Sequence, residues 1–177
     1  MPKTYTVANV IGGHRPAWLA DSIPNPLDQK GNKLMLDMQP GNGVQVPNAG
    51  LASPINFTVN NFIYTNGLFQ CMALCAVWNK VGNLFQNGYL AHVSNMGPPP
   101  NAPQPVVPPF IQTATQAIPA GAWIVADIGV GLRAWGPTLA QRLINLGHAN
   151  DHIWIYYRAA NGQVGFGIDR QGQFGET

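Results

Sequence analysis

Proline and glycine divide this chain into short segments, and this spacing limits what it can fold into. The 177 residues include 16 prolines and 20 glycines. Residues 14–32, 41–54 and 96–110 are so rich in Pro, Gly, Asn or Asp that we expect them to be loops. The last of these contains seven prolines. Each lacks the N–H donor that a sheet or helix interior needs, so this loop is predicted to be extended and polyproline-like.

The apolar segments between these loops are short and rich in β-branched and aromatic residues, which favours strands. Residues 71–78 are apolar on both faces, so periodicity does not distinguish a buried strand from a buried helix. The segment is short, which favours a strand. With residues 88–94 they are expected to form an antiparallel hairpin connected by residues 79–87. Asn161-Gly162 predicts a second hairpin between residues 152–159 and 163–169. Further strands are predicted at 4–11, 33–38, 56–65 and 122–130.

One helix is expected after the segment 122–130. Gly136-Pro137-Thr138 is typical of a helix start, Gly147 of its end, and the residues between them form an apolar stripe. We therefore predict an α+β fold: a β-sandwich-like mixed core of mostly antiparallel strands, with a flanking helix and long Pro/Gly loops. Residues 1–177 are expected to form a single domain, with a core at about 55–170 and a loop-rich N-terminal part at 1–54.

Low charge argues against several classes of partner. Asp, Glu, Lys and Arg make up 9% of the chain and the net charge is +2, where about 25% charged residues is usual. No basic stripe is present, so no nucleic-acid partner is expected.

No stretch approaches the ~20 apolar residues of a membrane span. The first residues lack the apolar core of a signal peptide. We expect a cytoplasmic chain at synthesis, a monomer, whose export would use a route without a cleaved signal peptide.

The two cysteines, Cys71 and Cys75, are expected to differ in role. On a strand their Cα atoms would lie about 13 Å apart, beyond the roughly 7 Å limit for a disulfide. Cys75 is interpreted as a small buried hydrophobe. Cys71 begins its strand just after Thr65-Asn66-Gly67, so its sulfur can reach the surface.

A candidate catalytic site follows from the predicted hairpin. A thiol needs a base to become a nucleophile, and the base needs a third group to orient it. If the strands pair, Cys71 and His92 can be neighbours, and Thr65 can hold the second nitrogen of the imidazole ring. The alternative is that His92 is a structural histidine in mid-strand.

Other polar residues have weaker interpretations. His148 and His152, with Asp151 between them, have the spacing of zinc ligands if they share one helix. Gly147 is predicted to end the helix before them. We therefore expect no metal and no cofactor. Asp127, in the apolar segment 122–130, is interpreted either as an edge residue or as a partner of a catalytic group.

The segment from Thr65 to Cys71 (TNGLFQC), followed by a strand, a turn and Ala91-His92, resembles the bacterial cysteine glutamine deamidases of the chemotaxis-receptor type. The arrangement is similar to that of Burkholderia lethal factor and the catalytic domains of cytotoxic necrotizing factors. It covers about thirty residues. The gap from Cys71 to His92 is longer than in the family, and the Leu-Ser-Gly-Cys signature of the toxins is replaced by Leu68-Phe69-Gln70-Cys71.

The resemblance implies that Cys71, His92 and Thr65 are catalytic residues and that the substrate is a protein presenting a Gln or Asn side chain. It implies a hydrolase without a cofactor or metal, and the long loops favour a bacterial toxin or effector delivered to a target cell. Three alternatives remain from the residues themselves: a cysteine protease, a transglutaminase-type enzyme, and a non-enzymatic β-rich binding domain.

Overall fold

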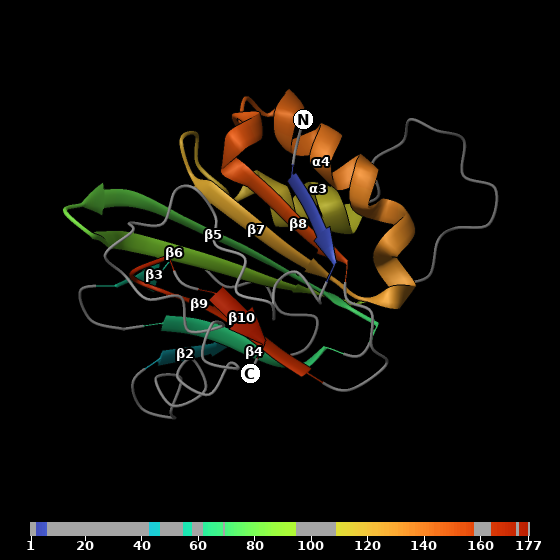
Figure 1. Ribbon diagram of the computed structural model, residues 1–177, viewed down its shortest axis with the longest axis horizontal. Helices are drawn as coiled ribbons and strands as arrows, with labels where there is room; N and C mark the ends of the chain where they lie inside the picture. The colour runs from blue at the N-terminus through green and yellow to red at the C-terminus, as the bar shows by residue number, and fades with distance from the viewer. Residues whose placement is uncertain are drawn as a thin grey trace.

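Two β-sheets and two α-helices make up the fold in the computed structural model, which describes residues 3–6, 43–46, 55–57, 62–68, 70–94, 109–157, 164–172 and 174–176. The larger sheet has the strand order β1-β8-β7-β5-β6-β3 and the smaller sheet the order β10-β9-β4-β2 (Figure 1). The strands are β1 (Lys3–Thr6), β2 (Gly43–Val46), β3 (Ile55–Asn56), β4 (Phe62–Leu68), β5 (Met72–Val81), β6 (Leu84–Val93), β7 (Trp123–Ile128), β8 (Ile153–Tyr157), β9 (Val164–Asp169) and β10 (Phe174–Glu176).

The helices and the smaller sheet lie on opposite faces of the larger sheet (Figure 1). Helices α3 (Pro109–Gln116) and α4 (Gly136–Asn145) cover one face, and two 3-10 helices, η2 (Val130–Trp135) and η3 (Asn150–His152), flank α4 along the chain. The molecule therefore has three layers, and the predicted α+β class with a sandwich-like core is confirmed.

Strand β5 lies in the middle of the larger sheet and contributes to two hydrophobic clusters. Because side chains alternate across a strand, Ala73 and Cys75 pack in the cluster between the two sheets. Met72 and Leu74 pack in the cluster beneath the helices. This double burial explains why residues 71–78 are apolar at every position.

The predicted β5–β6 hairpin is confirmed, but its connection is shorter than expected. Val81 pairs with Leu84, so only Gly82 and Asn83 form the turn. Gly82 has φ +60°, a conformation that glycine adopts without a Cβ penalty. Asn79 and Lys80 are exposed although they belong to β5, which is why their polarity resembles that of a loop.

Three expectations for the chain after residue 54 were wrong. Residues 56–65 do not form one strand: β3 pairs with β6 in the larger sheet, whereas β4 belongs to the smaller one. Strands β8 and β9 do not form a hairpin, since β8 pairs with β1 and β7 while β9 pairs with β4 and β10. In both places the chain passes from one sheet to the other, and local turn signals do not encode which strand becomes the partner. Helix α3 begins at Pro109, within the predicted loop 96–110, because proline is tolerated in the first turn of a helix.

The N-terminal part contributes strands to both sheets. Strand β1 pairs in parallel with β8, and β2 pairs in parallel with β4. Gly43–Val46 was expected to be loop, so that prediction was wrong. Its partner β4 lies far along the sequence, and local composition does not reveal such a pairing. The predicted loop 14–32 and strand 33–38, and the Asn161-Gly162 turn, lie outside the described residues.

Helix α4 matches its prediction closely. Leu139 and Leu143 are buried against the larger sheet, and Gly147 follows the helix with φ +92°. Leu146, at the end of the predicted stripe, is exposed. No helix in the described part of the chain is long and apolar enough to cross a membrane.

Candidate functional site

Thr65, on β4, connects the two sheets through its side chain. The residue is fully buried. Its hydroxyl donates a hydrogen bond to the carbonyl oxygen of Val46 on β2, at 2.7 Å. The same oxygen lies 2.7 Å from Nδ1 of His92 on β6. The structure thus brings Thr65 to a ring nitrogen of His92.

These two contacts fix the proton on the His92 ring. A threonine hydroxyl has one proton to donate, and the Val46 carbonyl, which can only accept, takes it. The Thr65 oxygen must therefore accept from Nδ1–H of His92. The neutral ring then carries its proton on Nδ1 and presents Nε2 as the base, the tautomer that a nucleophilic thiol requires.

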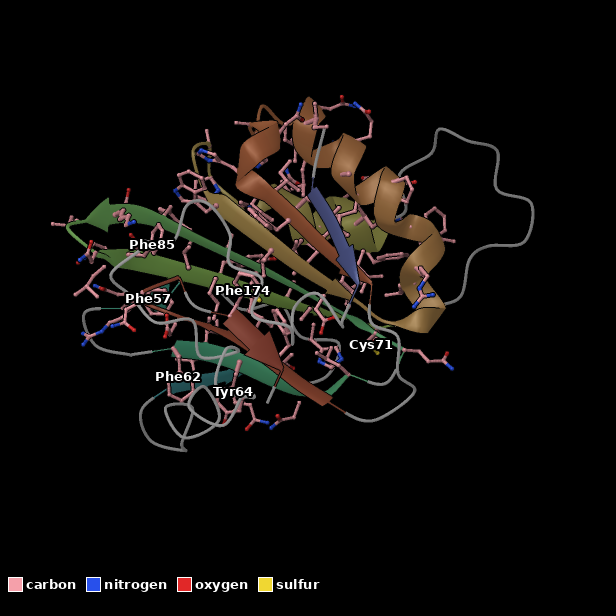
Figure 2. All side chains as sticks on the ribbon, in the orientation of Figure 1. Phe57, Phe62, Tyr64, Cys71, Phe85 and Phe174 are labelled. Atoms are coloured by element: carbon pink, nitrogen blue, oxygen red, sulfur yellow. The ribbon has the colours of Figure 1, made fainter. Side chains whose placement is uncertain are left out.

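Cys71 lies immediately before β5 and on the same face as His92. Ala73 pairs directly with His92, and Cys71 is two residues before Ala73, so its side chain is on the same face and diagonal to the ring. Cys71 packs at the margin of the cluster between the sheets and is half-buried, whereas His92 is 2% exposed. Figure 2 shows Cys71 at the opposite end of the larger sheet from Phe85. The thiol is thus the outer group and the imidazole the inner one.

Gly129, just after β7, fixes the backbone of Cys71. Its N–H donates to the Cys71 carbonyl oxygen at 2.9 Å. A Cβ at position 129 would lie 2.6 Å from that oxygen and 2.8 Å from the carbonyl carbon of Gln70, so only glycine allows this approach. Sequence reasoning missed Gly129; its one signal is a glycine directly after an apolar strand.

Strand β4, which precedes Cys71 in the chain, has an irregularity in its pairing. Its pairing with β9 shifts between Thr65 and Leu68, and Gly67 has φ +73°. A bulge of this kind re-aims the chain. Here it lies between the residue that holds the imidazole and the segment leading to the thiol.

Asp127 is a further buried polar residue near this site, besides Thr65 and His92. It is on β7, directly opposite Ala73, and 1% exposed. His92, Ala73 and Asp127 therefore form one row across three adjacent strands. Of its two interpretations, a residue at an exposed edge is excluded, because β7 lies between β8 and β5.

Cys75 has the environment of a structural cysteine. It is completely buried, and neither Cys75 nor Cys71 forms a disulfide. Burial, and secondarily the charge of Asp127, raise the pKa of the Cys75 thiol well above its usual value. A protonated, enclosed thiol is a poor nucleophile, so the interpretation of Cys75 as a small hydrophobe fits the structure.

The two histidines after α4 are separate from this arrangement. His148 is buried, neither ring nitrogen has a hydrogen-bond partner, and burial, then the charge of His152, lowers its pKa. His152 stacks on Trp123 with ring centroids 3.4 Å apart, and its Nδ1 lies 3.2 Å from the Ala122 carbonyl oxygen. Within the described ranges, no three His, Cys, Asp or Glu side chains are grouped as metal ligands.

No family model matches this sequence, and no curated protein matches it either.

Proposed function

We propose that the chain is a protein-glutamine or asparagine deamidase in which Cys71 is the nucleophile, His92 the acid–base and Thr65 the group that orients the ring. The observation that carries this proposal is the hydrogen bond from Nδ1 of His92 to Thr65, at 2.7 Å. In the resulting tautomer Nε2 is the basic ring nitrogen, and His92 is on the same face of the sheet as Cys71. The resemblance of residues 65–92 to the deamidases supports the same three residues.

The proposed reaction begins when Nε2 of His92 takes the proton of the Cys71 thiol. The thiolate attacks the carboxamide carbon of the substrate side chain and forms a tetrahedral oxyanion. Backbone N–H groups at the start of β5, including that of Cys71, are proposed to hold this oxyanion; such a donor typically contributes about 3–4 kcal/mol. His92 then protonates the departing nitrogen, the C–N bond breaks and ammonia leaves.

The second half of the reaction regenerates the enzyme. The acyl group is now a thioester on Cys71. His92 takes a proton from a water molecule, the resulting hydroxide attacks the thioester carbon, and the C–S bond breaks. The product is a Glu or Asp side chain, and the proton on His92 returns to the thiolate. No cofactor or metal takes part in this scheme.

The substrate is proposed to be a folded protein, and the chain a bacterial toxin or effector. With only 9% charged residues, charge steering is weak and recognition by shape is favoured. The thiol is at the outer margin of the site, where an amide side chain on another protein can approach it, while the base behind it is shielded from solvent.

Mass spectrometry of protein substrates tests the proposal. Casein, and separately extracts of bacterial and mammalian cells, would be incubated with the wild type, Cys71→Ala and Cys75→Ala. We expect ammonia release and the mass gain of an amide converted to an acid with the wild type and Cys75→Ala, and neither with Cys71→Ala. Cleaved peptides would indicate a protease instead, amine adducts a transglutaminase-type enzyme, and an unchanged substrate with an unreactive Cys71 a binding domain.

A further inference from the structure

We propose that Asp127 is a positioning residue of this site, whose negative charge stabilises the protonated His92 ring. The inference deepens the proposed function and rests on it. In that reaction His92 carries a positive charge from the first proton transfer until it protonates the departing nitrogen, and again while the thioester is hydrolysed. Thr65 orients the ring but is neutral, so it supplies no compensating charge. The carboxylate that orients and stabilises the base in a serine-protease triad would here be replaced by two residues.

The strand register places Asp127 in line with His92. Ala73 pairs with His92 on one side and with Asp127 on the other. Because neighbouring strands are about 4.8 Å apart, the Cα atoms of His92 and Asp127 are about 10 Å apart, and their side chains rise from the same face. The residue between them in this row is Ala73, whose side chain is only a methyl group.

Burial makes a charge at this position effective. His92 and Asp127 are both almost completely enclosed between the sheets. A charge interaction is screened much less in such a layer than at the surface. The charge of Asp127 already contributes to the raised pKa of Cys75, which lies on the same face, one row further into the sandwich.

Few other titratable groups face His92 among the described residues. Strand β5 presents Cys71 and Cys75 on this face, and β7 presents Asp127. On the next strand, β8, Tyr156 pairs with Asp127. The smaller sheet contributes the neutral Thr65, backed by Val46 of β2 and paired with Phe166 of β9. Asp169 is at the far end of β9, paired with Phe62. Once Cys71 is replaced, Asp127 is the acidic residue in line with the ring.

The test is an NMR titration of His92 in the Cys71→Ala protein, so that the thiol makes no contribution. The His92 signal is assigned by its loss in His92→Gln. With Asp127 present, we expect the His92 ring to be half protonated at a pH above about 6.5, the ordinary pKa of a histidine. Asp127→Asn, which keeps the shape of the side chain, should lower this midpoint by about one pH unit, a tenfold loss of proton affinity. Asp169→Asn removes another buried carboxylate and should leave it unchanged.

Equal midpoints with and without the Asp127 carboxylate would overturn the inference. If Asp127→Asn fails to fold, the Cys71→Ala parent decides alone: burial without a nearby anion lowers the midpoint of a histidine, so a value below 6.5 would also overturn it. The titration does not require activity. A wild type that converts no amide, combined with a His92 titration that depends on Asp127, would refute the deamidase and leave the charge coupling in place.

Discussion

The hydroxyl of Thr65 accepts a 2.7 Å hydrogen bond from Nδ1 of His92 because its own proton is donated to Val46. Three strands meet in this contact: β2 supplies the carbonyl, β4 the hydroxyl and β6 the ring. The N-terminal strand β2 therefore takes part in setting the tautomer of a histidine 46 positions after Val46 in the chain (92 − 46). An orientation built this way depends on an oxygen at position 65 more than on the exact side chain.

Replacing Thr65 tests this directly. Thr65→Val keeps the shape and removes the acceptor, so the ring can adopt the wrong tautomer. We expect the rate of Cys71 alkylation at pH 7 to fall about tenfold, the equivalent of one hydrogen bond of about 1.4 kcal/mol. Thr65→Ser keeps the hydroxyl and should retain most of the rate. Equal rates in the valine and serine variants would show that the hydroxyl does not orient the ring.

Gly129→Ala tests whether the backbone contact after β7 positions the thiol. The added Cβ would meet the Cys71 carbonyl oxygen at 2.6 Å, and relieving such a clash costs about 1–3 kcal/mol. We expect a lower free energy of unfolding in urea and slower alkylation of Cys71. Gly82→Ala is the control: its φ of +60° also penalises a side chain, but nothing lies within 4 Å of the new Cβ. It should lose stability and keep the alkylation rate; a loss of rate in both variants would mean that destabilisation alone is responsible.

Alkaline pH should destabilise the fold through Cys75. Burial, then the Asp127 charge, raise its pKa in the folded protein, so above the ordinary thiol value of about 8.5 the unfolded chain releases a proton that the folded one keeps. The contribution of the Cys75 thiol to folding stability is fully present below a pH of about 8.5 and is lost as the pH rises above it. Urea unfolding from pH 8 to 10 under reducing conditions should show a steeper loss of stability for the wild type than for Cys75→Ala. If the stability of both proteins fell equally with pH, the burial of Cys75 would be contradicted.

Acidic pH should destabilise the fold through His148. Its pKa is lowered by burial and by His152, so below the ordinary value of about 6.5 the unfolded chain binds a proton that the folded one rejects. Stability should therefore fall as the pH drops below 6.5. His148→Leu removes the titrating ring and its two unpartnered nitrogens. We expect its stability to vary less between pH 7 and 5 than that of the wild type; an unchanged slope would refute this origin.

Local patterns were enough to predict β5, β6, α4 and the overall class. Residues 71–78 alternate between two apolar environments, and α4 has a proline start and a glycine end. The contact of Thr65 with His92 could be anticipated because its residues lie within one segment of the sequence. The pairings of β2 with β4 and of β9 with β4 could not, since nothing local in residues 43–46 or 164–169 specifies a distant partner.

Two features of the site, the role of Gly129 and the position of Asp127, could not be predicted from the sequence for the same reason. Gly129 is required by the backbone of residues 70 and 71, and the position of Asp127 beside Ala73 depends on how β7 aligns with β5. Register across strands separated by more than fifty residues is a property of the whole sheet. The sequence does show an acidic residue in an apolar segment, but this pattern indicates neither its burial nor its partner.

Alkylation by iodoacetamide at pH 7, followed residue by residue by mass spectrometry, tests most directly whether His92 activates Cys71. The proposed site predicts fast labelling of Cys71, no labelling of Cys75 until the protein is unfolded, and a loss of at least about 100-fold in the Cys71 rate in His92→Ala, as for removal of a general base. Slow labelling of Cys71 in the wild type, or a rate that is the same with and without the imidazole, would contradict it.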